Sequence, residues 1–229
     1  MNSSPLPDFR LTGRRALVTG SSQGIGLALA GALAAAGAHV ILNGRDSAKL
    51  ASAADKLRAA GNASIDTAAF DVTDEAAVNS AAAFGAIDIL VNNTGINIRG
   101  PLEKTTLADW ERVIRTNLTS AFLVARAVAP GMIARGSGKI INICSLMSEL
   151  ARPTIAPYAA AKGGLKMLTR SMCAEWARHN LQVNGIAPGY ILTELTAPLA
   201  ADPKFDSWIK ARTPAGRWGS VADLTGACV

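Results

Sequence analysis

The stretch Ala16-Leu-Val-Thr-Gly20-Ser-Ser-Gln-Gly24-Ile-Gly26 sets the architecture of this chain, because an apolar strand turns here through glycines directly into a helix. Glycine permits the tight turn, and without side chains the backbone N–H groups can approach the pyrophosphate of a dinucleotide. The dipole at the start of the helix also attracts negative charge. A glycine cluster alone is a weak signal, but its place between a strand and a helix favours a dinucleotide site. The turn is therefore predicted to bind a cofactor through Gly20, Ser22, Gln23, Gly24, Ile25 and Gly26.

On either side of this turn, short apolar runs alternate with helical patterns. Strands are predicted over residues 16–19, 39–43, 67–71, 87–92, 139–144 and 182–187. Helices are predicted over residues 24–36, 47–60, 106–134, 157–178 and 221–229, with a short one after residue 73. Ser47, Thr73 and Thr106 are expected to cap three of them. Apolar strands that alternate with helices indicate a parallel sheet covered on both faces, and right-handed crossovers make it doubly wound.

The predicted fold is therefore a single α/β domain over residues 1–229 with a Rossmann-like sheet. No low-complexity linker or further repeat divides the chain. Residues 190–219 include a more polar segment punctuated by prolines, and we expect them to form a lobe that acts as a substrate lid.

Composition argues against several classes of protein. The chain has 229 residues, 49% of them hydrophobic, which suits one domain with a sizeable core. Its formal charge of +6 could favour anionic cofactors or substrates, although solubility alone explains it equally well. Lysines and arginines are scattered and are not interleaved with aromatic residues, so nucleic-acid binding is not expected.

Cysteine usage and the N-terminus bear on location. The three cysteines have no paired or metal-ligand spacing, and the two histidines lie far apart, so we expect neither disulfides nor a metal site. The N-terminus lacks the charged and apolar regions of a signal peptide. The longest apolar stretch, residues 25–42, is broken by Gly37 and His39 and does not indicate a membrane span. The sequence predicts a cytoplasmic protein without a membrane partner.

A candidate catalytic pair follows in the second half of the chain. Tyr158 and Lys162 are four residues apart in a predicted helix, so they lie on one face, one turn from each other. A free phenol has a pKa of about 10, and a nearby ammonium group stabilises the phenolate and lowers that pKa. The pair is predicted to be a general acid/base centre, with Ser145 holding the oxygen that is protonated. The same spacing also occurs by chance on many solvated helices.

The end of the second predicted strand indicates which nicotinamide cofactor is used. An acid there would accept hydrogen bonds from the ribose hydroxyls and favour NAD(H). This chain has Arg45, which can pair with a 2′-phosphate, so NADP(H) is favoured while NAD(H) stays open. Asp46 could still turn inward, and Arg45 could be a solvated loop arginine. Further cofactor contacts are expected at the ends of the third and fourth strands, from Asp71, Val72, Asn93, Thr94 and Gly95.

Assembled in order, these segments resemble the short-chain dehydrogenases/reductases over nearly the whole chain. The resemblance rests on the glycine turn, Asn92-Asn93-Thr94-Gly95, Asn117, Ser145, Tyr158 with Lys162, and Pro188-Gly189. It implies that Tyr158 exchanges a proton with the substrate oxygen and Ser145 hydrogen-bonds that oxygen. It further implies that Lys162 lowers the tyrosine pKa and binds the nicotinamide ribose, and that Asn117 holds a water for proton relay. Other implied cofactor contacts are Pro188, Gly189, Ile191 and Thr193, the last at the nicotinamide carboxamide.

Within the family the chain looks most similar to the gluconate 5-dehydrogenase branch. Four segments carry this likeness: residues 42–45, 142–153, 187–190 and 212–219. The likeness implies interconversion of D-gluconate and 5-keto-D-gluconate, and a homodimer or homotetramer. Ser145 and Tyr158 would contact the substrate, Glu149 would accept hydrogen bonds from its hydroxyls, and Arg152 or Arg99 would pair with its carboxylate. For each arginine, a surface salt bridge is an equally good interpretation.

Three departures from the family pattern matter. Thr94 replaces the usual alanine, and Gln23 stands where NADP-using members often carry arginine, which weakens the NADP(H) prediction. Family members also continue beyond a helix like that at 221–229 into a last edge strand, which we expect to be missing through truncation, an unresolved end or loss in a defective remnant. The segment between residues 71 and 87 also looks short. Two alternatives therefore stay open: a reductase of another ketone, such as a 3-oxoacyl thioester or another sugar, and a truncated non-catalytic nucleotide-binding protein.

Overall fold

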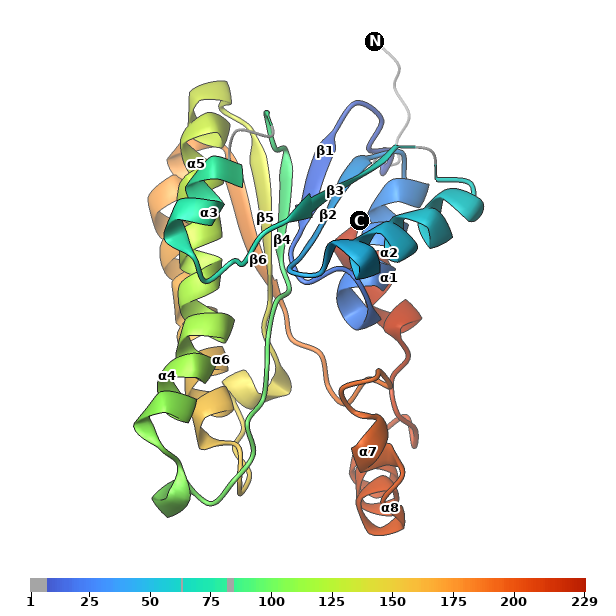
Figure 1. The fold of residues 1–229 in the computed structure, drawn as a ribbon, viewed down its shortest axis with the longest axis vertical. Coiled ribbons are helices and arrows are strands. Elements are labelled where there is room, and N and C mark those ends of the chain that lie inside the picture. Colours follow the sequence, from blue (N-terminus) through green and yellow to red (C-terminus); the bar gives the residue numbers. More distant parts are fainter. Residues whose placement is uncertain (1–7, 63, 82–84) are drawn as a thin grey trace.

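A six-stranded parallel sheet forms the centre of the molecule in the computed structural model, which describes residues 8–62, 64–81 and 85–229 (Figure 1). The strand order is β3-β2-β1-β4-β5-β6. Since the order reverses between β1 and β4, helices are carried to both faces of the sheet. The predicted doubly wound α/β fold is confirmed. The strands are β1 (Arg15–Val18), β2 (His39–Gly44), β3 (Ile65–Ala69), β4 (Ile89–Asn92), β5 (Gly138–Ile143) and β6 (Leu181–Ile186).

Two apolar cores lie on the two faces of this sheet, because alternate residues of a strand point in opposite directions. In β1, Ala16 and Val18 join the core under the helices α1 (Gly24–Ala35) and α2 (Ser47–Ala59). Leu17, between them, joins the opposite core. That second core lies under α3 (Glu75–Ala81), α5 (Ser120–Arg135) and α6 (Ala156–Trp176), on the other side of the sheet in Figure 1.

A long helical run leads into α5. It begins with α4 (Leu107–Ile114), passes through a π-helical turn (Arg115–Thr119) and continues as α5. Thr106 caps its start as predicted, because its hydroxyl accepts from the Asp109 N–H at 3.1 Å. By length and composition alone this run could cross a membrane, but half of its apolar window is buried in the fold, as in a core helix.

Two other predicted caps are wrong by one residue. Asp46, not Ser47, caps α2, because its carboxylate accepts from the Lys49 N–H at 3.0 Å. Asp74, not Thr73, caps α3, since its carboxylate accepts two first-turn N–H groups at 2.9 and 3.1 Å. In both cases the residue one place away from the predicted cap has a carboxylate, and the carboxylate takes the capping position.

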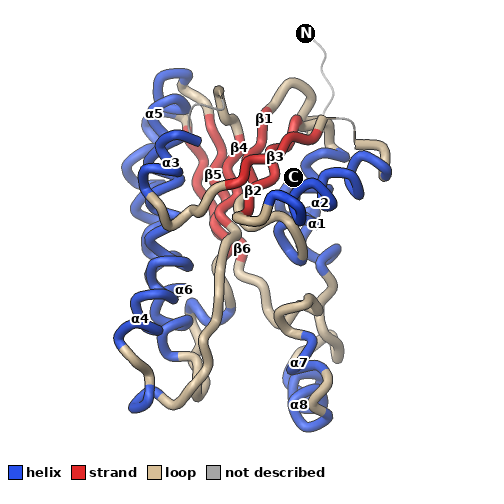
Figure 2. Tube along the Cα trace, in the orientation of Figure 1, coloured by secondary structure: helices blue, strands red, loops and turns tan. Residues whose placement is uncertain are grey.

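Beyond the carboxyl ends of the strands the chain forms two extensions (Figure 2). One holds α4 and the start of α6, and the other is a lobe with α7 (Ala197–Ala200) and α8 (Pro203–Arg212). The base of the lobe is closed where Leu192 donates to the Gly219 carbonyl and Gly219 donates to the Tyr190 carbonyl, each at 2.8 Å. The predicted bounds of the lobe, residues 190–219, and its action as a lid stay predictions.

The far side of the sheet ends at β6, whose outer edge pairs with no strand among the described residues. After the lobe, a 3₁₀ turn (Val221–Leu224) and α9 (Thr225–Cys228) pack against α1. Leu224 and Cys228 complete the core on that face.

Candidate active site

The glycine turn between β1 and α1 has the geometry of an anion cradle. Gly20 and Gly24 have φ of +60° and +59°, a region that side chains other than glycine rarely enter. A Cβ on Gly26 would overlap the Gly20 carbonyl oxygen and the Asn93 side-chain amide. Gln23 precedes α1 without a side-chain cap, so the first-turn N–H groups have no side-chain acceptor from that residue. The turn therefore fits the pyrophosphate predicted for it.

Two asparagines hold this turn in place. Asn93 donates from its amide to the carbonyl oxygens of Thr19 at 3.0 Å and Gly20 at 2.9 Å. Asn43, which is 1% exposed, accepts from the Gly20 N–H at 3.4 Å and donates to two carbonyls beside β3 at 3.1 Å each. The role of Asn43 was missed, because the sequence places it only as the last residue of a strand. Its polarity within an apolar run was the available signal.

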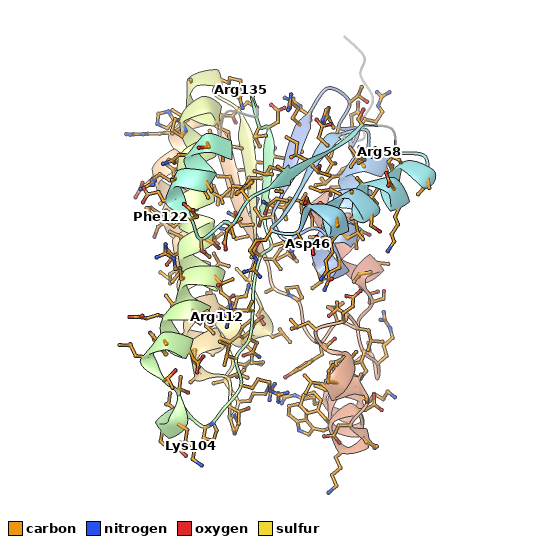
Figure 3. The ribbon with its side chains drawn as sticks, in the orientation of Figure 1. Asp46, Arg58, Lys104, Arg112, Phe122 and Arg135 are labelled. Atoms are coloured by element: carbon orange, nitrogen blue, oxygen red, sulfur yellow. The ribbon has the colours of Figure 1, made fainter. Side chains whose placement is uncertain are left out.

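The ends of β2 and β3 hold Arg45, Asp46 and Asp71, which bear on the choice of cofactor. Asp46 is occupied as the cap of α2, whose start Figure 3 labels, and this resolves whether it turns inward. Arg45 is exposed and lies 3.8 Å from Asp71, a loose ion pair. Asp71 also accepts from the Thr73 N–H and hydroxyl at 2.8 Å each. Val72 is buried beside these residues.

Ser145, Tyr158 and Lys162 come together at the carboxyl end of β5. Ser145 follows that strand and caps a 3₁₀ turn (Leu146–Ser148), while Tyr158 and Lys162 lie on the first turns of α6. The Lys162 ammonium is 3% exposed, donates to the Ile143 carbonyl, and lies 5.8 Å from the centroid of the Tyr158 ring. The predicted grouping of these side chains is thus observed.

The electrostatics of the tyrosine differ from the sequence prediction. Burial raises the pKa of Tyr158, because desolvation disfavours the phenolate, and the nearby Ser145 hydroxyl offsets part of that rise. Burial also lowers the pKa of Lys162 to about 8. The expected lowering of the Tyr158 pKa by Lys162 is not found, since the ammonium is directed at the Ile143 carbonyl instead of the phenol.

Asn117 lies on the π-helical turn and is 1% exposed. Its side-chain oxygen accepts from the Ile96 N–H and its amide donates to the Ile96 carbonyl, both at 2.7 Å. A Cβ on Gly95 would lie 3.3 Å from that oxygen, so a glycine suits the position. Both ends of the Asn117 amide are therefore used to hold the loop after β4.

A cavity of about 350 Å³ lies beyond Ser145, between the 3₁₀ turn Leu146–Ser148 and the lobe. Gly189, Tyr190 and Ile191 form part of its wall, and the Pro188 carbonyl accepts from the Leu146 N–H at 3.0 Å. Thr193 lies next to the glycine turn, with its methyl 3.8 Å from where a Cβ on Gly24 would be. The complete lining is Leu146, Met147, Leu150, Ala151, Arg152, Gly189, Tyr190, Ile191, Trp208, Ile209, Arg212, Thr213, Pro214, Arg217 and Gly219.

Of the residues predicted to bind substrate, Arg152 lies in the cavity lining and Glu149 lies outside it. Arg152 lines the cavity, and its buried Nε has no hydrogen-bond partner. Burial lowers the pKa of Arg99, and the positive charge of the nearby Arg152 lowers it further. Glu149 is exposed, forms an ion pair with Lys166, and is outside the cavity lining. The described residues contain no group of three His, Cys, Asp or Glu side chains that could hold a metal.

A glycine turn at the start of α1, with a serine, tyrosine and lysine at the end of β5, defines a nucleotide-dependent oxidoreductase of the short-chain type. The family model for short chain dehydrogenases matches residues 14–204. The chain belongs to that family.

Two curated relatives and one solved structure are similar to this chain over nearly its whole length. The chain is 54% identical to gluconate 5-dehydrogenase from Gluconobacter oxydans (strain 621H), over 97% of this chain and 89% of the relative. It is 48% identical to 5-keto-D-gluconate 5-reductase from Escherichia coli (strain K12), over 96% and 89%. A crystal structure of a gluconate 5-dehydrogenase from Burkholderia cenocepacia J2315, in complex with NADP and tartrate, is 55% identical. It covers 98% of this chain and 90% of its own, with a TM-score of 0.94.

Proposed function

We propose that the protein is an NADP(H)-dependent oxidoreductase that interconverts D-gluconate and 5-keto-D-gluconate. The observation that carries this proposal is a cavity that begins at Leu146, the residue directly after Ser145, and whose lining includes unpaired arginine and no carboxylate. A site of this kind suits a substrate that has both a carbonyl and a negative charge. The names and identities of the two curated relatives support the same substrate.

The cofactor would be held by the glycine turn and the strand ends. The N–H groups at Gly24, Ile25 and Gly26 would bind the pyrophosphate, and Arg45 would pair with the 2′-phosphate in place of its loose partner Asp71. Thr193 would reach the nicotinamide end from the lobe. When bound, NADP(H) supplies or accepts the hydride.

The protein's own residues move the proton. Tyr158 would donate its phenolic proton to the carbonyl oxygen during reduction, while Ser145 donates a hydrogen bond that orients that oxygen. A phenol with a raised pKa is protonated at neutral pH and is ready to donate. Lys162, whose ammonium donates to the Ile143 carbonyl, would bind the nicotinamide ribose. Because the Asn117 side chain is fully used by Ile96, we assign its main-chain carbonyl to the relay water.

The substrate carboxylate would be received by Arg152 and Arg99. Arg152 lines the cavity with an unmet Nε–H donor, and Arg99 lies close enough for the two charges to interact. A planar carboxylate matches the fork of a guanidinium group. Glu149 is a weaker candidate for the substrate hydroxyls, since Lys166 already neutralises it.

The apolar part of the cavity lining favours a second candidate function. The cavity is bordered by Leu146, Leu150 and Ile209, so a less polar ketone, such as a 3-oxoacyl thioester, would find apolar contacts there. A non-catalytic nucleotide-binding protein is less well supported, because the serine, tyrosine, lysine and asparagine of the site are all present.

One assay separates the three candidates. The purified protein is incubated with NADPH or NADH and with 5-keto-D-gluconate, an acetoacetyl thioester or another keto sugar, and cofactor oxidation is followed by absorbance. We expect fastest turnover with 5-keto-D-gluconate and NADPH. Turnover restricted to the other ketones would reject the gluconate proposal. A folded sample that binds NADPH but reduces none of them would leave the non-catalytic interpretation.

We further propose a cytoplasmic homo-oligomer. Phe122 on α5 and Met167 on α6 are exposed apolar side chains on the helices that cover one face of the sheet, and Figure 3 labels Phe122 on the outer side. Light scattering of the purified protein would give the mass of a dimer or tetramer, and a monomer mass would reject this proposal.

A further inference from the structure

The cavity beside the active site has a charge imbalance that the proposed chemistry does not fully use. Its charged lining residues are Arg152, Arg212 and Arg217, and none of its lining residues is acidic. Arg217 is neutralised by Asp223, to which it donates at 2.7 and 3.0 Å. Arg152 and Arg212 take part in none of the ion pairs formed in the described part of the chain. Two uncompensated cations therefore face one cavity.

Both guanidinium groups are positioned by stacking on rings of α8. The Arg152 guanidinium carbon lies 5.4 Å from the centroid of the Phe205 ring, and that of Arg212 lies 4.5 Å from the centroid of the Trp208 ring. The two rings are neighbours, with their centroids 5.4 Å apart. Stacking uses the faces of a guanidinium group and leaves its N–H edge free to donate in the plane. The buried, unpartnered Nε of Arg152 is such an unmet donor.

The two arginines come from different parts of the molecule. Arg152 lies in the segment between the 3₁₀ turn Leu146–Ser148 and α6, which follows Ser145 in the chain. Arg212 is the last residue of α8, in the lobe formed by residues 190–219. A compact anion that accepted hydrogen bonds from both would join the lobe to the body of the enzyme. Such an anion would also be held at a fixed distance from the reacting carbonyl.

We propose that Arg212 is a specificity-determining residue that binds the substrate carboxylate together with Arg152, so that the charge of the substrate holds the lobe against the body. The proposal deepens the assignment of a keto-acid substrate and rests on it for the identity of the ligand. It adds a residue from the lobe to the substrate site. It also makes the lobe selective, since an uncharged sugar of the same shape would form an ion pair with neither arginine.

The turnover test compares Arg212→Gln with the wild type on two ketones. One is 5-keto-D-gluconate, and the other is the ketose that has a hydroxymethyl group in place of the carboxylate. Loss of a hydrogen bond to a charged group is expected to raise KM for the keto acid roughly 10- to 100-fold. The KM for the uncharged ketose should stay within about 2-fold. Lys204→Gln is the matched control, because it removes the same charge from α8 at an exposed residue outside the cavity lining.

Three results of this test would overturn the proposal. Arg212→Gln could raise KM equally for both ketones, or it could leave both KM values unchanged. Either result would show that Arg212 makes no specific contact with the carboxylate. An equal KM increase in Lys204→Gln would show that the KM increase in Arg212→Gln comes from the loss of long-range positive charge and not from a contact with the carboxylate.

A binding test separates this proposal from the assignment of the substrate. Tartrate and its uncharged counterpart threitol are titrated calorimetrically into the NADPH-loaded protein, which requires no turnover. We expect tartrate to bind the wild type at least about 10-fold more tightly than Arg212→Gln, with no such loss in Lys204→Gln. If that loss is seen but 5-keto-D-gluconate is not reduced, the carboxylate site stands and the gluconate function fails. Equal tartrate affinity in all three proteins, or no tartrate binding, contradicts the proposal.

Discussion

Lys162 is a charged side chain with almost no contact with water. It is 3% exposed, and burial lowers its pKa to about 8 from an ordinary value of 10.5. The spacing of Tyr158 and Lys162 predicted that they share a helix face. It could not predict that the ammonium donates to the Ile143 carbonyl, because that contact depends on how closely α6 packs on β5. For the same reason the sequence did not predict the role of Asn43, whose partners lie in two separate segments, the glycine turn and the end of β3.

The buried ammonium has a consequence for stability. A pKa that is lower in the folded state means that the unfolded chain binds more protons between about pH 8 and 10.5, so this group adds stability as pH rises through that window. Lys162→Met should remove that rise in the free energy of unfolding with pH, which is on the order of a few kcal/mol. Urea unfolding of both proteins at pH 7.5 and 10 measures the difference. A wild-type stability that fell relative to the variant between these pH values would contradict the assigned direction.

Thr94 departs from the family pattern and leaves a polar atom without a partner. Its buried hydroxyl makes no hydrogen bond, and it lies 2.9 Å from where a Cβ on Gly20 would be. Thr94→Ala should therefore be neutral or stabilise the fold by about 1 kcal/mol, because it removes an unsatisfied buried group. Denaturant unfolding checks the direction. A loss of more than about 1 kcal/mol would show that the hydroxyl has a partner.

Helix α6 is joined to the sheet by a buried polar chain. Asn92 donates to Asn142 at 2.9 Å, Asn142 donates to the Thr169 hydroxyl at 2.9 Å, and that hydroxyl donates to the Leu165 carbonyl at 2.7 Å. Together with the Lys162 contact, this chain fixes the position of α6 along β5, and hence of Tyr158 relative to Ser145. The sequence predicted the helix and the strand, but not this connection, because buried amides in strands give no periodic signal.

Thr169→Val tests that connection. The substitution keeps the shape but leaves the Asn142 amide without its acceptor, so unfolding free energy should fall by about 1–3 kcal/mol. Thr169→Ser, which retains the hydroxyl, should lose less. Denaturant unfolding of the three proteins gives the comparison. Equal stability of the valine variant and the wild type would mean that the amide finds another partner.

At the scale of the whole molecule, the fold could be predicted from patterns that repeat along the chain. The candidate site could be predicted only in part. Alternating strands and helices predicted the sheet, and the residues at its carboxyl edge were predicted in the correct neighbourhood. Arg152 was among the predicted substrate residues, but the cavity, Arg212 and the stacking on α8 were not predicted, because these residues are distant in sequence or belong to a lobe without a strong periodic pattern. In the proposed function, the strand ends and α6 supply the cofactor turn and the proton-transfer residues, and the lobe supplies residues that select a substrate.

The proposed proton transfer by Tyr158 to a keto acid connects these parts, and Tyr158→Phe tests it. The variant removes one hydroxyl from a partly buried ring and leaves the glycine turn intact. NADPH oxidation is measured with 5-keto-D-gluconate for both proteins, and NADPH binding is measured in parallel by fluorescence. We expect the wild type to turn over and the variant to lose at least about 100-fold in kcat while it binds NADPH with unchanged affinity. A variant that retained near wild-type kcat would contradict the mechanism.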